Sequence, residues 1–262
     1  MEHSLKEKIR LEKISEYFLT NKNILDNSIG ILSYQDTSIQ TFIAAHVAGH
    51  LIKKGIDVTI LDLFQDFPNT KCFFDKNNIL ESNVYERSSC ISEKPEYVKQ
   101  CKNFDEITIF LEKEYKKETS NSKNKRSVLL NIPFDATNNM WQVLKMVRNV
   151  VIITNDKIDA LLRTSNILKK LFSKNTISYA GIVFGRIKKK NDPMDFFEKI
   201  CKSVNPEFSK YIINLGTINS CQEIFHSLLA GRLVFEDHAD SEIAARIKCL
   251  IENLYAHISM QT

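Results

Sequence analysis

Blocks of apolar and polar positions alternate along the chain and predict strands and helices in turn. Between Ser28 and Pro68, an apolar strand at 29–32 precedes a polar turn, a helix at 38–54 and a second apolar strand at 57–62. Strand, crossover helix and strand form a βαβ unit, which opens a parallel sheet. Gly55 follows the helix, where glycine commonly ends one. The rest of the chain is predicted to extend this unit.

The alternation continues toward the C-terminus. Further apolar strands are predicted at 127–132, 149–153, 178–184 and 211–215. Helices are predicted at 103–117, 137–147, 156–173, 193–203, 218–230 and 239–258. Nearly unbroken apolar strands are typical of a parallel sheet covered on both faces. We therefore expect an α/β fold with a mainly parallel sheet, helices on both faces, and a single domain over residues 28–262.

Three segments lie outside the alternation of strands and helices. Residues 4–19 are predicted to be helical, with Ser4 and Glu7 as a capping box, within an N-terminal helical segment 1–27. This helix is interpreted as packed on the domain surface, with partner docking as the alternative. Loop with a short helix is predicted for 66–100, and a solvated loop for 116–126.

Three predicted helices carry more detailed expectations. Asp192 and Pro193 suit the N-cap and first position of helix 193–203. The helix at 156–173 is expected to turn inward Ile158, Leu161, Leu162, Ile167, Leu168 and Leu171. The closing helix is expected to bury Ile243, Ile247, Leu250, Ile251 and Leu254. Because it has few cations, it does not resemble a basic membrane tail.

Composition narrows the function classes. Hydrophobic residues make up 43% of the 262 positions, which favours a large core over disorder. The net charge of +4 arises from 36 basic and 32 acidic residues, too balanced to indicate nucleic-acid binding. The six cysteines lack paired spacing, and the charged N-terminus and absence of a long apolar run predict no signal peptide or membrane span. We expect a cytoplasmic protein with reduced thiols.

The polar turn from Ser33 to Gln40 is the first candidate for chemistry. In nucleotide-binding proteins of this layout, the corresponding turn carries glycines and a lysine that hold phosphate. The turn here has neither residue type. The scaffold of a nucleotide-binding site is thus predicted without the residues that bind the nucleotide.

Taken in order, the segments resemble the MinD/ParA family of P-loop ATPases, and within it the FlhG group of flagellar-number regulators. The stretch IGILSYQDTSIQTFIAAHVAGHLIKKGIDVTILD lies where the family has a strand, a KGGVGKTT-type loop, a helix and a VLLID-type strand. SVLLNIPFD corresponds to the strand with the DTPAG-type switch, and GIVFGRI to the GVVLNRV-type strand. The resemblance covers about residues 28–254 and implies that family's fold.

The resemblance also implies where the family's nucleotide-binding residues fall. The two lysine positions are Tyr34 and Ile39. The family's glycines fall at Gln35, Asp36 and Ser38 in the turn and at Asp135 in the switch. The hydroxyl that binds magnesium falls at Gln40, beside Thr41, and the carboxylates fall at Asp62, Phe64 and Asn131. The asparagine that reads adenine falls at Gly185. Among these positions the family's residue type survives at Asp62 alone.

Physical reasoning favours a site that no longer binds nucleotide, and no cofactor is expected. Side chains at glycine positions block the approach of backbone N–H groups to phosphate. Asp36 would repel phosphate by roughly 4 kcal/mol at about 4 Å and a dielectric constant near 20, whereas the exposed helix dipole offers only ~0.3–1 kcal/mol. Asp36, Thr37 or Ser38 is expected to cap the helix instead.

Other candidates have ordinary structural interpretations. His46 and His50 share a helix face at metal-ligand spacing, but the sequence suggests no third ligand, so no metal site is predicted. Asp62 is interpreted as a remnant that hydrogen-bonds the altered loop. The run Lys188–Lys190 is interpreted as a solvated turn.

The leading hypothesis is a catalytically inactive MinD/ParA/FlhG-like protein that binds protein partners during placement or assembly of a cellular machine. By resemblance, the flagellum or another polar assembly supplies those partners. The protein is expected to be a monomer or a nucleotide-independent dimer that binds no nucleic acid. One alternative is a divergent ATPase or GTPase that uses Lys53, Lys54 or Lys188–Lys190. Another is a relative of bacterial tyrosine-kinase cytoplasmic domains, since DLFQDFP echoes their DADLRRP.

Overall fold

The computed structural model describes residues 28–64, 70–74, 98–101, 105–107, 109–110, 126–134, 138–144, 146–173, 177–188 and 191–259. The predicted helix at 4–19, the segment 1–27 and residues 116–125 of the predicted loop at 116–126 lie outside these residues, and Arg126 begins a strand. Of the predicted helix at 103–117, the described residues 105–107 and 109–110 are helical.

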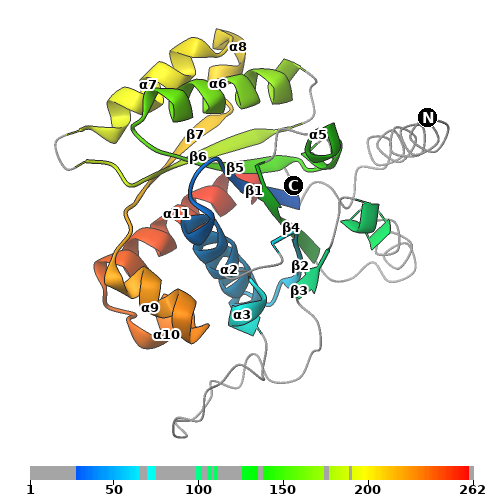
Figure 1. Ribbon diagram of the computed structural model, residues 1–262, viewed down its shortest axis with the longest axis vertical. Helices are drawn as coiled ribbons and strands as arrows, with labels where there is room; N and C mark the ends of the chain where they lie inside the picture. The colour runs from blue at the N-terminus through cyan, green and yellow to red at the C-terminus, as the bar shows by residue number, and fades with distance from the viewer. Residues whose placement is uncertain are drawn as a thin grey trace, which may run out of the picture.

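Seven parallel strands form one sheet in the order β3-β2-β4-β1-β5-β6-β7 (Figure 1). The strands are β1 (Ser28–Ser33), β2 (Asp57–Asp62), β3 (Val98–Gln100), β4 (Arg126–Pro133), β5 (Asn149–Thr154), β6 (Tyr179–Gly185) and β7 (Ile212–Ile218). In the centre, Ile31 of β1 pairs with Asn131 of β4 and Val151 of β5. The predicted α/β fold with a parallel sheet is confirmed.

Helices cover both faces of this sheet (Figure 1). One layer contains α5 (Asn138–Leu144), α6 (Ile158–Ser173), α7 (Pro193–Ser203) and α8 (Pro206–Ser209). The opposite layer contains α2 (Thr37–Lys53), α3 (Lys71–Phe74), α9 (Gln222–Ala230), α10 (Val234–Asp237) and α11 (Glu242–Ser259). No helix in the described part of the chain is long and apolar enough to cross a membrane.

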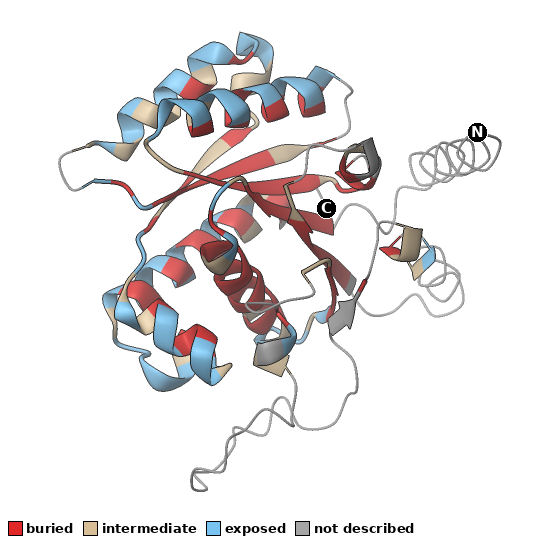
Figure 2. Ribbon diagram, viewed as in Figure 1, coloured by how far each residue is buried: buried red, intermediate tan, exposed pale blue. Residues whose placement is uncertain are grey.

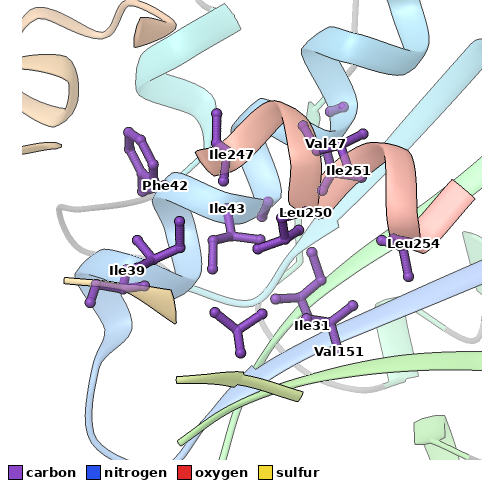
Figure 3. Packing of buried hydrophobic residues seen from close by; sticks show 14 of the residues in the cluster. Ile31, Ile39, Phe42, Ile43, Val47, Val151, Ile247, Leu250, Ile251 and Leu254 are labelled. Carbon is purple, nitrogen blue, oxygen red and sulfur yellow. The ribbon is translucent and has the colours of Figure 1, made fainter. Parts of the chain in front are cut away.

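The core around α2 explains why that helix is buried on nearly all sides. Figure 3 shows Ile43 of α2 between Ile31 of the sheet and Ile247 and Leu250 of α11, and Phe42 lies to one side of them in the same buried cluster. A helix that is apolar all round is one that neighbours cover completely. The expected inward face of α11 is confirmed, because all five of its named residues are buried.

The expected inward face of α6 is partly wrong. Ile158 and Leu162 are 76% and 60% exposed, whereas Ile167, Leu168 and Leu171 are buried as expected. The buried stripe is completed by Ala160, Thr164 and Ser165, which are small enough to lie against the sheet. Ile158 and Leu162 lie outside that stripe, so an apolar residue type alone misplaces them.

The start of α7 and the end of α2 lie where the capping residues in the sequence predict them. Asp192 caps α7 by accepting a hydrogen bond from the Met194 amide, with Pro193 at the first position. After α2, Gly55 has a φ of 75°, its amide donates to Ile52, and the next amide, that of Ile56, donates to Leu51. This is the Schellman arrangement, which glycine permits at little steric cost.

Four short or terminal features differ from the sequence predictions. The three-residue β3 and the four-residue α8 and α10 lack a long enough pattern to be predicted. β7 continues to Ile218, whereas the sequence predicts that it ends at 215 and that a helix begins at 218. Gly216 has a φ of 98°, and the pairing with β6 shifts register there. The irregularity interrupts the apolar alternation, which hides the rest of the strand.

Candidate functional site

The candidate site lies where the carboxyl ends of the central parallel strands meet, which is where open α/β sheets bind ligands. The turn between β1 and α2 crosses this edge. Described residues from the turn, β2, β4 and β6 meet there: Gln35, Asp36, Ile39, Gln40, Asp62, Asn131 and Arg186. The structure therefore brings together residues that the sequence assigned to one site from separate segments.

Asp36 occupies the N-terminus of α2. Its Oδ1 accepts a hydrogen bond of 3.0 Å from the Ile39 amide, and its own amide donates to Ser33 Oγ at 2.9 Å. The predicted cap from this turn is confirmed, and Asp36 provides it. Asp36 Oδ2 also forms a 2.5 Å ion pair with Arg186 Nε. The expected repulsion of phosphate takes Asp36 as an isolated charge, whereas the structure gives it a cationic partner.

Gln40 lies one turn further into α2 and is fully buried. Its amide nitrogen lies 2.9 Å from each of three acceptors, the carbonyls of Ile31 and Ile132 and the side-chain oxygen of Asn131. Three converging acceptors fix the orientation of the amide group, because only its NH₂ end can donate. Gln40 Oε1, at the other end, is buried without a hydrogen-bond partner among the described residues.

The hydrogen bonds continue from Asn131 to Asp62. Asn131 Nδ2 lies 3.3 Å from both carboxylate oxygens of Asp62. Asp62 also accepts from the Phe64 amide at 2.8 Å and from the Thr70 amide and hydroxyl at 2.7 and 2.5 Å. The expectation that Asp62 hydrogen-bonds the altered turn is wrong: its partners are Thr70, Phe64 and Asn131, because β2 ends beside β4 and the start of α3 and not beside the turn itself.

Burial raises the pKa of the Asp62 carboxyl above its ordinary value, while hydrogen bonds from Thr70, Phe64 and Asn131 act in the opposite direction. A buried carboxylate needs such donors, because it has lost its hydration. The chain Gln40, Asn131, Asp62, Thr70 thus links α2, β4, β2 and the start of α3 through side chains.

The rim of the turn is joined to the β5–α6 connection. Gln35 accepts from Asn155 at 3.0 Å and lies 3.5 Å from Asp159 Oδ2. The Arg163 guanidinium lies 4.1 Å from the centroid of the Tyr34 ring, a cation–π distance. Phe134 contacts the same ring edge-on, with centroids 5.5 Å apart.

Ile39 and Gly185 face each other inside the site. Ile39 is 1% exposed, and its Cδ1 would lie 3.2 Å from a Cβ at Gly185. The isoleucine therefore occupies the space in front of the glycine. Of the other positions that correspond to the family's nucleotide site, Thr41 is buried, and Ser38 and Phe64 are half-buried. Asp135 lies outside the described residues.

His46 has an entirely structural setting. Its Nδ1 lies 2.7 Å from the Phe42 carbonyl, and its Nε2 accepts from the Val234 amide at 2.8 Å. Nδ1 therefore carries the proton, and neither nitrogen is available to a metal. Burial lowers the pKa of His46 to about 3. No group of three metal-ligating side chains occurs within the described residues.

The sequence does not predict two cations that the structure places at the site, Arg186 and Arg163. Arg186 follows the end of β6 and has a φ of 53°, a left-handed conformation that is uncommon for arginine. Its position after a predicted parallel strand was the available signal. Arg163 could not be found this way, because its contact with Tyr34 depends on how α6 crosses the edge. Lys53 and Lys54 lie at the opposite end of α2, about 25 Å of helix from the turn.

Comparisons with known proteins give structural matches only. No family model matches the sequence, and no curated protein matches it. MinD from Aquifex aeolicus, also solved in complex with MinC, superposes with a TM-score of 0.62 at 14% identity, covering 88% of this chain and 97% of that one. The chain has the fold of MinD.

Two further MinD/ParA structures agree. A ParA family ATPase from Chlorobium tepidum gives a TM-score of 0.54 at 15% identity, covering 85% of this chain and 97% of that one. The septum site-determining protein MinD in complex with Mg-ADP from Pyrococcus horikoshii gives 0.58 at 16% identity, covering 87% and 95%. At such identities, the MinD/ParA likeness establishes the fold and leaves the chemistry to the residues at the site.

Proposed function

We propose that this protein is a catalytically inactive member of the MinD/ParA fold that binds protein partners without nucleotide control. The single observation that carries the proposal is the buried hydrogen-bond chain from Gln40 through Asn131 to Asp62. By the resemblance, Gln40 lies at the position of the family's magnesium hydroxyl, and Asp62 and Asn131 lie at two of its carboxylate positions.

The chemistry of this chain does not suit a magnesium ion. Magnesium needs oxygen ligands at about 2.0–2.1 Å in octahedral geometry. Here the NH₂ groups of Gln40 and Asn131 point at the available oxygens and fill the hydrogen-bonding sites that a metal would use. Asp62 is already supplied with donors by Thr70 and Phe64.

The phosphate side of the site gives independent support. A helix N-terminus binds anions through free amides and its dipole. The Asp36 carboxylate already accepts from the Ile39 amide and pairs with Arg186, so a protein group occupies the place of the anion. The side chain of Ile39 fills the space beside Gly185, where the resemblance places adenine recognition.

A divergent nucleotide-binding site is the second candidate, and Arg186 is the observation that favours it. This arginine is 61% exposed at the edge where phosphates bind in the fold. Lys188 lies two residues further on and is also exposed. A nucleotide would have to displace Asp36 from Arg186, and Asp36 would then oppose the phosphate.

Isothermal titration with ATP, ADP and GTP in the presence of magnesium tests the two candidates. The inactive protein should show no heat of binding up to roughly millimolar nucleotide, which corresponds to about −4 kcal/mol. Binding at micromolar concentration would overturn the proposal. In that case Arg186→Ala serves as the matched variant, because a divergent site built on Arg186 should lose affinity on its removal.

The cellular role follows by resemblance to proteins that place or assemble cellular machines, with the flagellum first among them. Affinity purification of the tagged, cytoplasmic protein from its native cells should recover flagellar or polar assembly proteins equally well with and without added ATP. Ile39→Val, a mild change inside the site, should alter stability and leave that recovery intact. Loss of the partners with unchanged stability would argue that the site itself is active.

A further inference from the structure

Two surface helices each expose a pair of large apolar side chains. Ile158 and Leu162 of α6 are 76% and 60% exposed, and Phe225 and Leu229 of α9 are 59% and 58% exposed. Each pair has i, i+4 spacing, so its two side chains lie one turn apart on the same side of the helix. Apolar side chains grouped in this way mark interaction surfaces more often than single ones do.

The two surfaces carry opposite charge. The α6 surface, residues 157–170, has one carboxylate, Asp159, and four cations, Lys157, Arg163, Lys169 and Lys170. The α9–α10 surface, residues 222–240, has one cation, Arg232, and four carboxylates, Glu223, Glu236, Asp237 and Asp240. A chain that is nearly balanced overall thus separates its charge between these two helical regions, and the patterns are complementary.

The two surfaces lie on opposite sides of the sheet. In Figure 1, α6 lies in the upper helical layer with α7 and α8, while α9 and α10 lie in the lower layer beside α2 and α11. Figure 2 shows exposed positions along the outer sides of both layers. The sheet separates the surfaces within one molecule, so only a second molecule can bring complementary surfaces together.

We propose that the α6 surface of one copy docks on the α9–α10 surface of a second copy. The apolar pairs meet at the centre, and the cations of the α6 surface face the carboxylates of the α9–α10 surface. Such a contact is heterologous, because it joins different surfaces and leaves one of each kind unoccupied. Repetition produces a ring or a filament. The contact needs no nucleotide and does not depend on the proposed function.

Sedimentation velocity over a concentration series tests this assembly. The wild-type protein should form species larger than a dimer as its concentration rises, and high salt should weaken them, because salt screens exposed charges. Leu162→Glu places a carboxylate on the α6 surface, and Leu229→Lys places a cation on the α9–α10 surface. Each substitution opposes the charge of the partner surface and should weaken self-association at least about tenfold.

Mixing the two variants distinguishes a head-to-tail contact from a symmetric one. The L162E protein keeps an intact α9–α10 surface, and the L229K protein keeps an intact α6 surface. Their mixture should associate with wild-type affinity through these two intact surfaces, which neither variant can bring together alone. If neither variant alone associates and the mixture also stays monomeric, the head-to-tail arrangement is wrong.

Met194→Glu provides the matched control. Met194 is 48% exposed on α7, in the same layer as α6 but outside both surfaces. This variant should assemble like the wild type. A wild-type protein that remains monomeric at every concentration would overturn the proposal, as would undiminished assembly of L162E and L229K. Thermal melts followed by circular dichroism should show all three variants folded, because the changed side chains are exposed.

Discussion

The two halves of α2 differ in what holds them in place. The first turn is fixed by polar partners: Asp36 caps it and pairs with Arg186, and Gln40 bonds Asn131. The later turns are fixed by apolar packing, with Phe42 and Ile43 buried in the cluster that α2 forms with the sheet and α11. Apolar packing tolerates many residue types of similar volume, whereas each polar contact requires a particular partner.

This difference matters for function because both halves lie in one continuous helix. The apolar half preserves the MinD/ParA fold, and the polar half determines what the carboxyl edge of the sheet can bind. The residues of the polar half can therefore change their chemistry while the fold persists. Mutations in the two halves should differ in size, in pH dependence and in response to magnesium.

The largest expected effect is in the apolar half. Phe42→Ala removes a fully buried ring and should lower the free energy of unfolding by about 3–5 kcal/mol. Phe225→Ala, on an exposed ring of α9, is the matched control and should change it by less than about 0.5 kcal/mol. Urea unfolding of both variants measures the difference. Equal losses would mean that Phe225 is buried in solution, as in an assembled form of the protein.

The next effect is in the polar half. Asn131→Asp places a second carboxylate beside Asp62 and removes the Nδ2 donor, which should cost about 3 kcal/mol at pH 7. Two adjacent carboxylates retain a shared proton, so their folded pKa is raised. Stability is then present at low pH and lost as the pH rises, and urea unfolding at pH 5 and pH 7.5 should show a smaller loss at pH 5.

The effect of magnesium on the stability of N131D tests whether the site can still bind a metal ion. If the polar chain has replaced a metal site irreversibly, millimolar Mg²⁺ should not restore the stability of N131D at pH 7.5. Recovery with Mg²⁺, but not with an equal ionic strength of NaCl, would show that the site still binds a metal. Asp62→Asn in the N131D background restores a single charge and should recover part of the loss without any ion.

The sequence predicts the apolar half of this comparison much better than the polar half. The buried face of α11 follows from the helical period of its apolar residues, whereas α2 is apolar on nearly all sides, which indicates a helix that its neighbours cover completely. The Gln40–Asn131 bond joins residues 91 positions apart, and only the register of β1 against β4 brings them together. The sequence therefore marked both positions as unusual for the family but could not show that they contact each other.

Arg186 and Leu162 illustrate the same limit on the surface. Arg186 pairs with Asp36 only because β6 ends at the edge that α2 approaches. Leu162 has the residue type of a core position, yet the rotation of α6 over the sheet leaves it exposed. Such features depend on how elements are oriented to one another, which local patterns do not specify.

A smaller effect is the pH dependence of stability that His46 causes. The pKa of His46 is lowered to about 3 by burial, so the unfolded chain binds its proton first. Stability should thus be complete above pH 6.5 and decrease as the pH falls, by about 2 kcal/mol at pH 5. His46→Gln can still accept from the Val234 amide without titrating. Its stability, followed by urea unfolding from pH 5 to 8, should depend less on pH than that of the wild type.

The Asp36 cap should contribute less to the free energy of unfolding than the groups above. Asp36→Ala removes both the hydrogen bond from the Ile39 amide and the ion pair, at a cost of about 1–2 kcal/mol. Asp36→Asn keeps an oxygen for the cap and loses the charge, so it should cost roughly half as much. Thermal melts of the two variants separate the contributions. An Asn variant as unstable as the Ala variant would assign the whole effect to the ion pair.

The smallest effect separates charge from backbone strain at Arg186. The arginine side chain is 61% exposed, so loss of its ion pair should cost no more than about 1 kcal/mol. Its φ of 53° suits glycine better than any residue with a Cβ. Arg186→Gly should therefore be more stable than Arg186→Ala by up to about 1 kcal/mol, although both lose the same ion pair. Equal melting temperatures would show that the left-handed backbone carries no strain, leaving the ion pair with Asp36 as the reason for an arginine at this edge.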